Sequence, residues 1–313
     1  MRHQTFCAAL GLAVLYADAG HAQSPCRRCL DGFRYLPSSI VGDAFATTNF
    51  ENATGGGMAL NLNVPVRNAE GATIDSLNGD IGFLLVDFAY QKHLARWLAL
   101  RGGITAAGRI GTSIEAVAAS GASAAFGWTL GATVPLLDRQ KFLVSAVADV
   151  RHNTEYDINP YEFAQSIVNN GYGQGAKDTL LTSGGVNRWS LGVRGAWTVA
   201  RWIGLNGEVE SGAVDQASDS KSVTTFGTQV AFDFARLSSI PVGVSLGYHG
   251  QTGSGRTGSL SGGYRSGEVG VFYTGRTDFV IGGSFFLSRI ASQTSDVPDL
   301  DAVQFRVVTR IEF

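Results

Sequence analysis

The chain carries little charge for its length. Lys, Arg, Asp and Glu make up 16% of its 313 residues, whereas about 25% is usual for a soluble domain. The formal net charge is −2, so no basic excess points to a nucleic-acid partner. A soluble surface needs more charge than this, and the deficit favours a protein whose outer surface faces lipid.

Long apolar runs are equally scarce. The longest, Phe6 to Ala17, is shorter than the roughly 20 residues that a membrane-spanning helix needs. It follows Arg2 and precedes Gly20-His21-Ala22, which has the small-x-small pattern of a cleavage site. We therefore interpret residues 1–22 as a secretory signal peptide, with an uncleaved anchor as the alternative. The remaining choices are a soluble periplasmic protein or a membrane-spanning β-barrel.

Cysteine is rare as well. Of the three cysteines, Cys7 leaves with the signal peptide, and Cys26 and Cys29 form a CRRC sequence. In an oxidising compartment we expect a short-loop disulfide or a free pair with a structural role. A thioredoxin-like redox site would need a βαβ context, which is absent. Haem attachment would need a histidine where Leu30 stands, so we predict no cofactor and no metal.

Glycine, in contrast, is abundant, at 41 of 313 residues, and beyond about residue 55 apolar and polar residues alternate. Segments of about ten alternating residues are typical of transmembrane strands. The clearest runs from Arg188 to Val199, where Trp189 and Trp197 lie on one apolar face. At ~3.3 Å per residue and a tilt of ~40° these tryptophans are separated by roughly 20 Å along the membrane normal. That spacing matches the distance between aromatic girdles, so this face is predicted to contact lipid.

The same pattern predicts twelve strands, an even number as single-chain barrels require. Their expected ranges are 56–66, 79–91, 97–109, 123–136, 141–152, 188–199, 202–213, 223–234, 241–250, 264–274, 278–288 and 302–313. Short and long connections alternate between them, and short turns are typical of the periplasmic side. We therefore expect an all-β, antiparallel, monomeric barrel over residues 55–313 with both termini in the periplasm.

The last predicted strand, VQFRVVTRIEF, alternates apolar residues and ends in Phe313. On this motif and the alternation over residues 55–313, the chain resembles the outer-membrane β-barrel superfamily of Gram-negative bacteria. The resemblance implies contact with outer-membrane lipids and recognition of Phe313 by the barrel-assembly machinery. Thr309, which stands among the apolar positions of the strand, is a mild departure from the pattern.

Residues 23–54 do not fit the strand pattern and are rich in turn formers and hydroxyl groups. They form either a periplasmic tether or a plug folded into the barrel. Tyr35, Phe45 and Phe50 favour the plug, because a tether would leave these aromatic rings in water.

If the tryptophan face points outward, a set of ionisable residues of both signs points into the lumen. Its members are Asp87, Arg101, Asp149, Arg151, Arg194, Glu208, Glu210, Asp233, Glu268, Arg306 and Arg310. An unpaired buried charge costs several kcal/mol, so one interpretation is a paired structural network. The other is a polar path whose charges tune selectivity for a small solute.

A catalytic alternative rests on YHGQTGSGR, with His249 at the end of a predicted strand and Ser254 five residues later. The chain resembles outer-membrane phospholipase A in its strand number. That family has its His and Ser two residues apart, and Gln251 occupies the corresponding position here. The favoured expectation is passive passage of small molecules. The alternatives are a barrel enzyme acting on phospholipid or lipopolysaccharide and a structural surface barrel.

Overall fold

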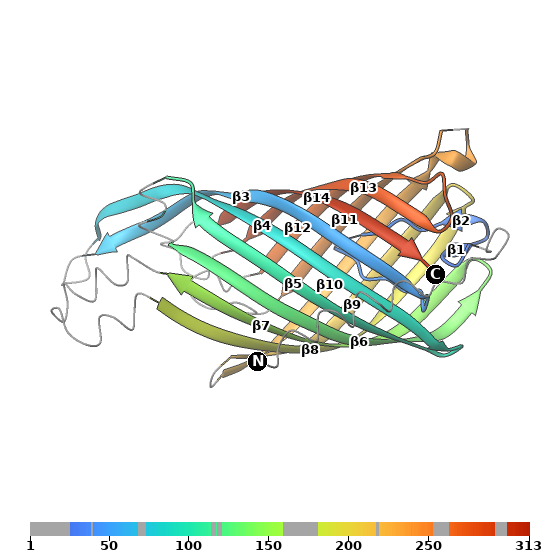
Figure 1. The fold of residues 1–313 in the computed structure, drawn as a ribbon, viewed down its shortest axis with the longest axis horizontal. Helices are drawn as coiled ribbons and strands as arrows, with labels where there is room; N and C mark the ends of the chain where they lie inside the picture. The colour runs from blue at the N-terminus through green and yellow to red at the C-terminus, as the bar shows by residue number, and fades with distance from the viewer. Residues whose placement is uncertain are drawn as a thin grey trace, which may run out of the picture.

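The computed structural model describes residues 26–38, 40–67, 73–113, 117, 121–158, 181–216, 219–238, 240–252, 263–291 and 299–313. Twelve long antiparallel strands close into one barrel (Figure 1). The strands are β3 (Asn49–Arg67), β4 (Thr73–Ala95), β5 (Leu98–Gly111), β6 (Ala122–Arg139), β7 (Phe142–Ile158), β8 (Leu181–Ala200), β9 (Ile203–Gln216), β10 (Asp219–Asp233), β11 (Val242–Thr252), β12 (Tyr264–Tyr273), β13 (Phe279–Ile290) and β14 (Leu300–Glu312). A short 3₁₀ helix, η1 (Phe234–Arg236), lies between β10 and β11. The ring closes where β14 pairs with β3, from Asp301 opposite Leu60 to Glu312 opposite Asn49.

The alternation along each strand separates an apolar outer face from a polar inner face, as in transmembrane barrels. On β8, Trp189 and Trp197 are about half exposed, at 48% and 50%, whereas Ser190 and Arg194 between them are buried. Large apolar side chains such as Leu84, Leu130 and Leu287 are exposed on the outside of other strands. This distribution confirms the predicted transmembrane antiparallel barrel. Within the described ranges no helix is long and apolar enough to cross a membrane.

The two ends of the barrel differ. At one end the strands are joined by short connections, such as residues 96–97, 140–141 and 201–202, and the C-terminus lies at this end with the small strands β1 and β2 (Figure 1). We call this the turn end and the opposite one the loop end. At the loop end the strands extend to different distances along the barrel axis, because β4 has 23 residues whereas β12 has 10.

All twelve predicted strands overlap observed ones, but several boundaries were wrong. β3 begins at Asn49, so residues 49–54 belong to the barrel and not to the N-terminal segment. Phe50 therefore packs on the outside, its ring 6.3 Å from that of Phe88. β9 continues to Gln216 and β10 begins at Asp219, so most of the loop predicted over 214–222 belongs to these two strands. β4 likewise begins at Thr73, inside the predicted loop 67–78.

Residues 26–48, which we call the inner segment, precede β3. They contain the two-residue strands β1 (Cys29–Leu30) and β2 (Phe33–Arg34), which pair only with each other among the described strands. Cys26 and Cys29 form a disulfide. The described remainder of the segment has no regular secondary structure, and its backbone is not part of the barrel ladder.

An apolar cluster fixes the inner segment inside the turn end. Phe33, Tyr35 and Leu36 are fully buried and the Phe33 and Tyr35 rings meet edge to face at 4.8 Å. They pack with inward side chains of several strands, among them Leu143, Ala196, Ala231, Phe272, Val280 and Val308. Burial of each large apolar side chain contributes about 1.5–3 kcal/mol, so this cluster is a substantial part of the segment's docking free energy.

Candidate functional site

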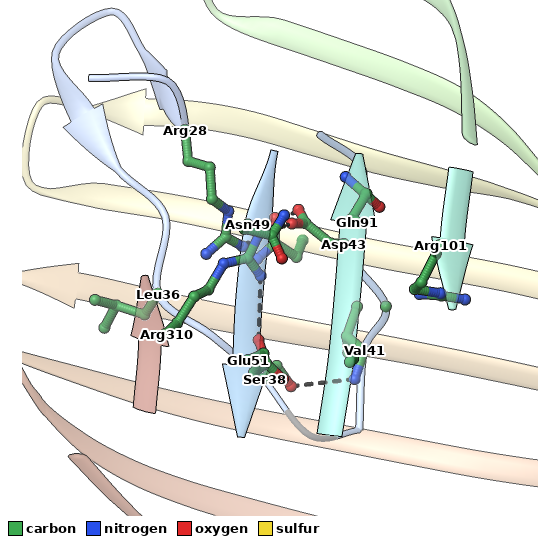
Figure 2. Close-up of a pocket in the computed structure, with 13 residues that line it drawn as sticks. Arg28, Leu36, Ser38, Val41, Asp43, Asn49, Glu51, Gln91, Arg101 and Arg310 are labelled. Carbon is green, nitrogen blue, oxygen red and sulfur yellow. Dashed lines mark hydrogen bonds and ion pairs between the residues drawn. The ribbon is translucent and has the colours of Figure 1, made fainter. Parts of the chain in front are cut away.

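The candidate site is the lumen at the turn end, where the inner segment meets the inward faces of the strands. The first element of the site is an ionic cluster around Asp43 (Figure 2). Arg28, from the segment, donates to Asp43 at 3.2 Å. Arg310, on β14, donates to Asp43, to Glu51 at 3.2 Å and to Glu312 at 2.7 Å.

The charges in this cluster decide the state of Asp43. Burial alone raises the pKa of its carboxyl group, but the positive charges of Arg28 and Arg310 and a hydrogen bond from the Phe45 N–H outweigh that effect and hold the pKa well below its usual range. Asp43 is therefore ionised at neutral pH, and it links the segment to the strand that closes the barrel.

The second element is centred on Arg194, which is 1% exposed on β8. Its guanidinium forms ion pairs with Asp149 at 3.1 Å, Glu208 at 3.3 Å and Glu210 at 2.5 Å. Arg101 binds the same Asp149 carboxylate through both oxygens, at 2.7 and 2.6 Å. This network lies across β5, β7, β8 and β9 and corresponds to the paired-charge interpretation of these residues.

The inner segment is bonded directly to this network. The backbone N–H of Gly42 donates to Glu208 at 2.7 Å. A Cβ atom added at Gly42 would overlap the guanidinium of Arg194. Only glycine lets the segment backbone lie this close to the buried arginine, so Gly42 is a point of close approach between segment and barrel.

Other hydrogen bonds join the segment to six further strands. Tyr35 bonds to Thr198 on β8 at 2.9 Å, and burial raises the pKa of Tyr35 to about 12, which keeps its hydroxyl protonated. The remaining bonds run from Ser145 to the Ala44 carbonyl at 2.6 Å, from Gln91 to the Phe45 carbonyl at 2.7 Å, from Gln229 to the Pro37 carbonyl at 3.3 Å, from Ser38 to Glu268 at 2.9 Å, and from Arg34 to the carbonyls of Thr274 at 3.5 Å and Phe279 at 3.3 Å.

A polar cavity of about 90 Å³ remains between the segment and the wall. Arg28, Asp43, Glu51, Gln91 and Arg310 are among its lining residues (Figure 2). At about 30 Å³ per water molecule in the liquid, it has room for a few waters. It is far smaller than a pocket for a drug-sized ligand, which occupies about 300 Å³ or more.

The other sequence-predicted lumen residues lie inside the barrel at different heights. Asp233 is buried at the turn end, where it caps η1 and accepts a hydrogen bond from Thr274 at 3.0 Å. Arg306 lies 3.9 Å from Asp87, which accepts a hydrogen bond from Thr105. Arg151, on β7, is half-buried and lies on the loop side of Asp149.

The geometry around His249 gives little support to the catalytic alternative. His249 points inward, and its Nδ1 is 3.7 Å from the Glu208 carboxylate. Ser254 lies outside the described residues. Ser266 is directly opposite His249 on β12, but its hydroxyl bonds to Ser288 at 2.8 Å. No described hydroxyl forms a hydrogen bond with His249, which a nucleophile activated by this base requires.

Sequence reasoning missed the residues that the inner segment itself contributes. Arg28, Arg34, Asp43 and Gly42 were not among the candidate lumen residues, because that set came from strand alternation alone. Their signal was present, since a free tether has little need of buried aromatic rings interspersed with arginine and aspartate.

Neither family models nor curated proteins match the chain. Among solved structures, it is similar to the translocator domain of the autotransporter NalP from Neisseria meningitidis, at 10% identity and a TM-score of 0.49, covering 87% of this chain and 90% of that one. It is also similar to the transport unit of the autotransporter AIDA-I from Escherichia coli, at 12% identity and a TM-score of 0.48, covering 85% and 90%. A third, the NanC porin, has 5% identity and a TM-score of 0.46, covering 84% and 100%. These resemblances concern the barrel fold alone.

Proposed function

We propose that this protein is an outer-membrane channel for small solutes, closed at the turn end by the inner segment. In this proposal the turn end and both termini face the periplasm, and the loop end faces outward. The outward apolar belt and the alternation of short and long connections support the placement.

The observation that carries the proposal is that the segment lying in the lumen is separate from the barrel ladder. Side-chain hydrogen bonds and ion pairs hold the inner segment against the barrel wall. Every barrel strand is paired with a barrel strand on each side, so the ladder does not depend on the segment. Displacing it therefore requires no strand to be broken. Above it, several inward residues of β5 and β6 are small and half-buried, namely Gly103, Thr105, Ala107, Gly127 and Thr129.

The test is a comparison of the full chain with a protein whose mature sequence begins at Thr48. This start keeps all of β3 and the hydrogen bond from the Phe313 N–H to the Thr48 carbonyl. Starting later, near Gly55, would remove a third of β3. We expect low conductance in planar bilayers for the full chain and clearly higher conductance for the shortened one.

Far-UV circular dichroism and the heat-dependent shift in gel mobility establish that the shortened protein is a folded barrel. A folded, shortened barrel that conducts no more than the full chain would contradict the proposal.

A structural surface barrel is the second candidate, and one observation favours it. β3, β4 and β8 have 19, 23 and 20 residues, about twice the 9–11 that a transmembrane strand needs. One side of the barrel therefore extends beyond the bilayer at the loop end. A closed, non-conducting barrel in both forms of the protein would support this function.

A further inference from the structure

We propose that Arg151 and Arg188 form a binding site for the oxyanion of a small solute, a carboxylate or a phosphate, in the loop-side half of the lumen. The pair lies on neighbouring strands, β7 and β8, in direct cross-strand register. Directly opposite residues in an antiparallel pair have Cα atoms about 5 Å apart. The two side chains point to the same side of the sheet, because each is two residues from a buried inward neighbour, Asp149 and Ser190.

Two like charges placed opposite each other destabilise a strand pair, so a compensating partner is expected. Among the described residues, no carboxylate forms a hydrogen bond or an ion pair with either arginine. Arg151 has neither a hydrogen bond nor an ion pair there, and Arg188 has a single hydrogen bond, to the neutral amide of Gln251 at 3.2 Å. Both side chains are half-buried and thus reachable from the lumen.

The acids nearest to this pair are already engaged. Asp149 is held by Arg101 and Arg194. Glu210 is held by Arg194 and accepts a hydrogen bond from Ser190 at 3.0 Å. The layer beneath the two arginines thus holds three carboxylates against two guanidinium groups, and with Arg151 and Arg188 the whole cluster carries one net positive charge that is available to a solute.

The surroundings suit a small anion. Thr129, on β6, is directly opposite Arg151 on the other side and offers a hydroxyl group at the same level. On β5 and β6 the nearby inward residues Thr105, Ala107 and Gly127 are small. Planar guanidinium groups bind carboxylate and phosphate oxygens through two parallel hydrogen bonds, so two of them suit a solute with more than one oxyanion oxygen.

Binding at this pair deepens the proposed channel function by naming its solute class, but it can be measured without conduction. The test is isothermal titration of the full-length, detergent-refolded protein with citrate and with inorganic phosphate. We expect saturable binding of at least one of them to the wild type, weakened at least tenfold in Arg151→Gln/Arg188→Gln.

The matched control is Arg265→Gln/Arg289→Gln. These two arginines are also directly opposite each other, on β12 and β13, but they lie on the outer face. This variant should bind like the wild type. Absence of saturable binding by both anions, or equal binding in the lumen double variant, would overturn the site.

Conduction separates the two proposals. In a KCl gradient, the reversal potential of the open barrel should indicate anion preference, which Arg151→Gln/Arg188→Gln reduces. Citrate or phosphate binding at the pair without any conductance in the shortened protein would leave the site standing and contradict only the channel. Conductance of the shortened protein without anion binding at the pair would support the channel and contradict the anion site.

Discussion

Gly42 is a point of close approach between the inner segment and the barrel, and a side chain there tests the proposed closure directly. In Gly42→Leu, the added atoms compete with the guanidinium of Arg194, which three acids hold in place. We expect the segment to be displaced and the conductance of the full-length protein to rise several-fold. Leaving a buried charge network incompletely paired costs about 3–5 kcal/mol, so thermal stability should fall as well.

Gly207→Leu is the control for this change. Gly207 lies on β9, where the nearest atom to an added Cβ is a carbonyl oxygen at an ordinary 3.7 Å. The same substitution there should leave conductance at the wild-type level. If both leucine variants open the channel equally, the effect of Gly42→Leu is not due to the segment.

If the inner segment closes the barrel as proposed, Asp43 should make that closure dependent on pH, and the sign follows from its environment. Because its pKa in the docked state is below the ordinary value of 3.8, the segment is stabilised at all pH values above about 4. That contribution is lost as the pH falls below 3.8 toward the docked-state value. We expect conductance to be constant from pH 8 to 5 and to rise only below about pH 4.

Asp43→Asn distinguishes this carboxylate from the neighbouring acids Glu51 and Glu312. The variant should already conduct at pH 7, because Arg28 and Arg310 lose the acid of the inner segment that lies between them, and only Glu312 of β14 still pairs with both. Closure of Asp43→Asn at neutral pH, with an unchanged acid response, would show that Asp43 is not the residue responsible.

At the scale of single elements, β8 tests the assignment of the two faces. Val193 lies midway between Trp189 and Trp197 and is 48% exposed on the outer face. Val193→Arg should place a charge near the bilayer midplane and cost about 2–4 kcal/mol of unfolding free energy. Urea titration in lipid vesicles measures it. Ala107→Arg, at a half-buried inward position of β5, should cost far less, and equal losses would mean that the faces are reversed.

The elements also show what the sequence could and could not predict. Strand number and facing were predictable because lipid outside and a polar lumen inside impose a period of two on every strand. Strand ends were not, because that constraint ends at the edge of the bilayer. Asn49, Glu51 and Asn52 continue β3 with polar side chains, and the ladder there is fixed by pairing with β14 and β4.

The site was predictable in its parts but not in its pairing. Alternation identifies Asp149, Arg194 and Glu208 as inward residues, and a single strand carries no information on which of them meet. Two of the three aromatic residues that suggested burial, Tyr35 and Phe45, are in the inner segment. The third, Phe50, belongs to β3, because the segment ends earlier than its composition suggested.

For the whole molecule, the proposed orientation is open to a labelling experiment. Gly184, in β8 at the loop end, is exposed, with no atom within 4 Å of an added Cβ. Gln140 is exposed in a turn at the opposite end. On intact cells, a membrane-impermeant maleimide should label Gly184→Cys and not Gln140→Cys, whereas permeabilised cells should show both. Labelling of Gln140→Cys alone on intact cells would reverse the orientation.

The pairing of β14 with β3 gives the inner segment a second consequence. Arg310 and Asp43 are 267 residues apart in sequence, and their contact lies beside the line along which the barrel closes. The segment is thus attached to both strands that close the barrel, because it continues directly into β3 and forms an ion pair with β14. Local opening of a protein starts where stabilising contacts are fewest. A barrel that releases its inner segment also loses the ion pair beside the pairing of β3 with β14. Opening the path should therefore lower the stability of that pairing as well.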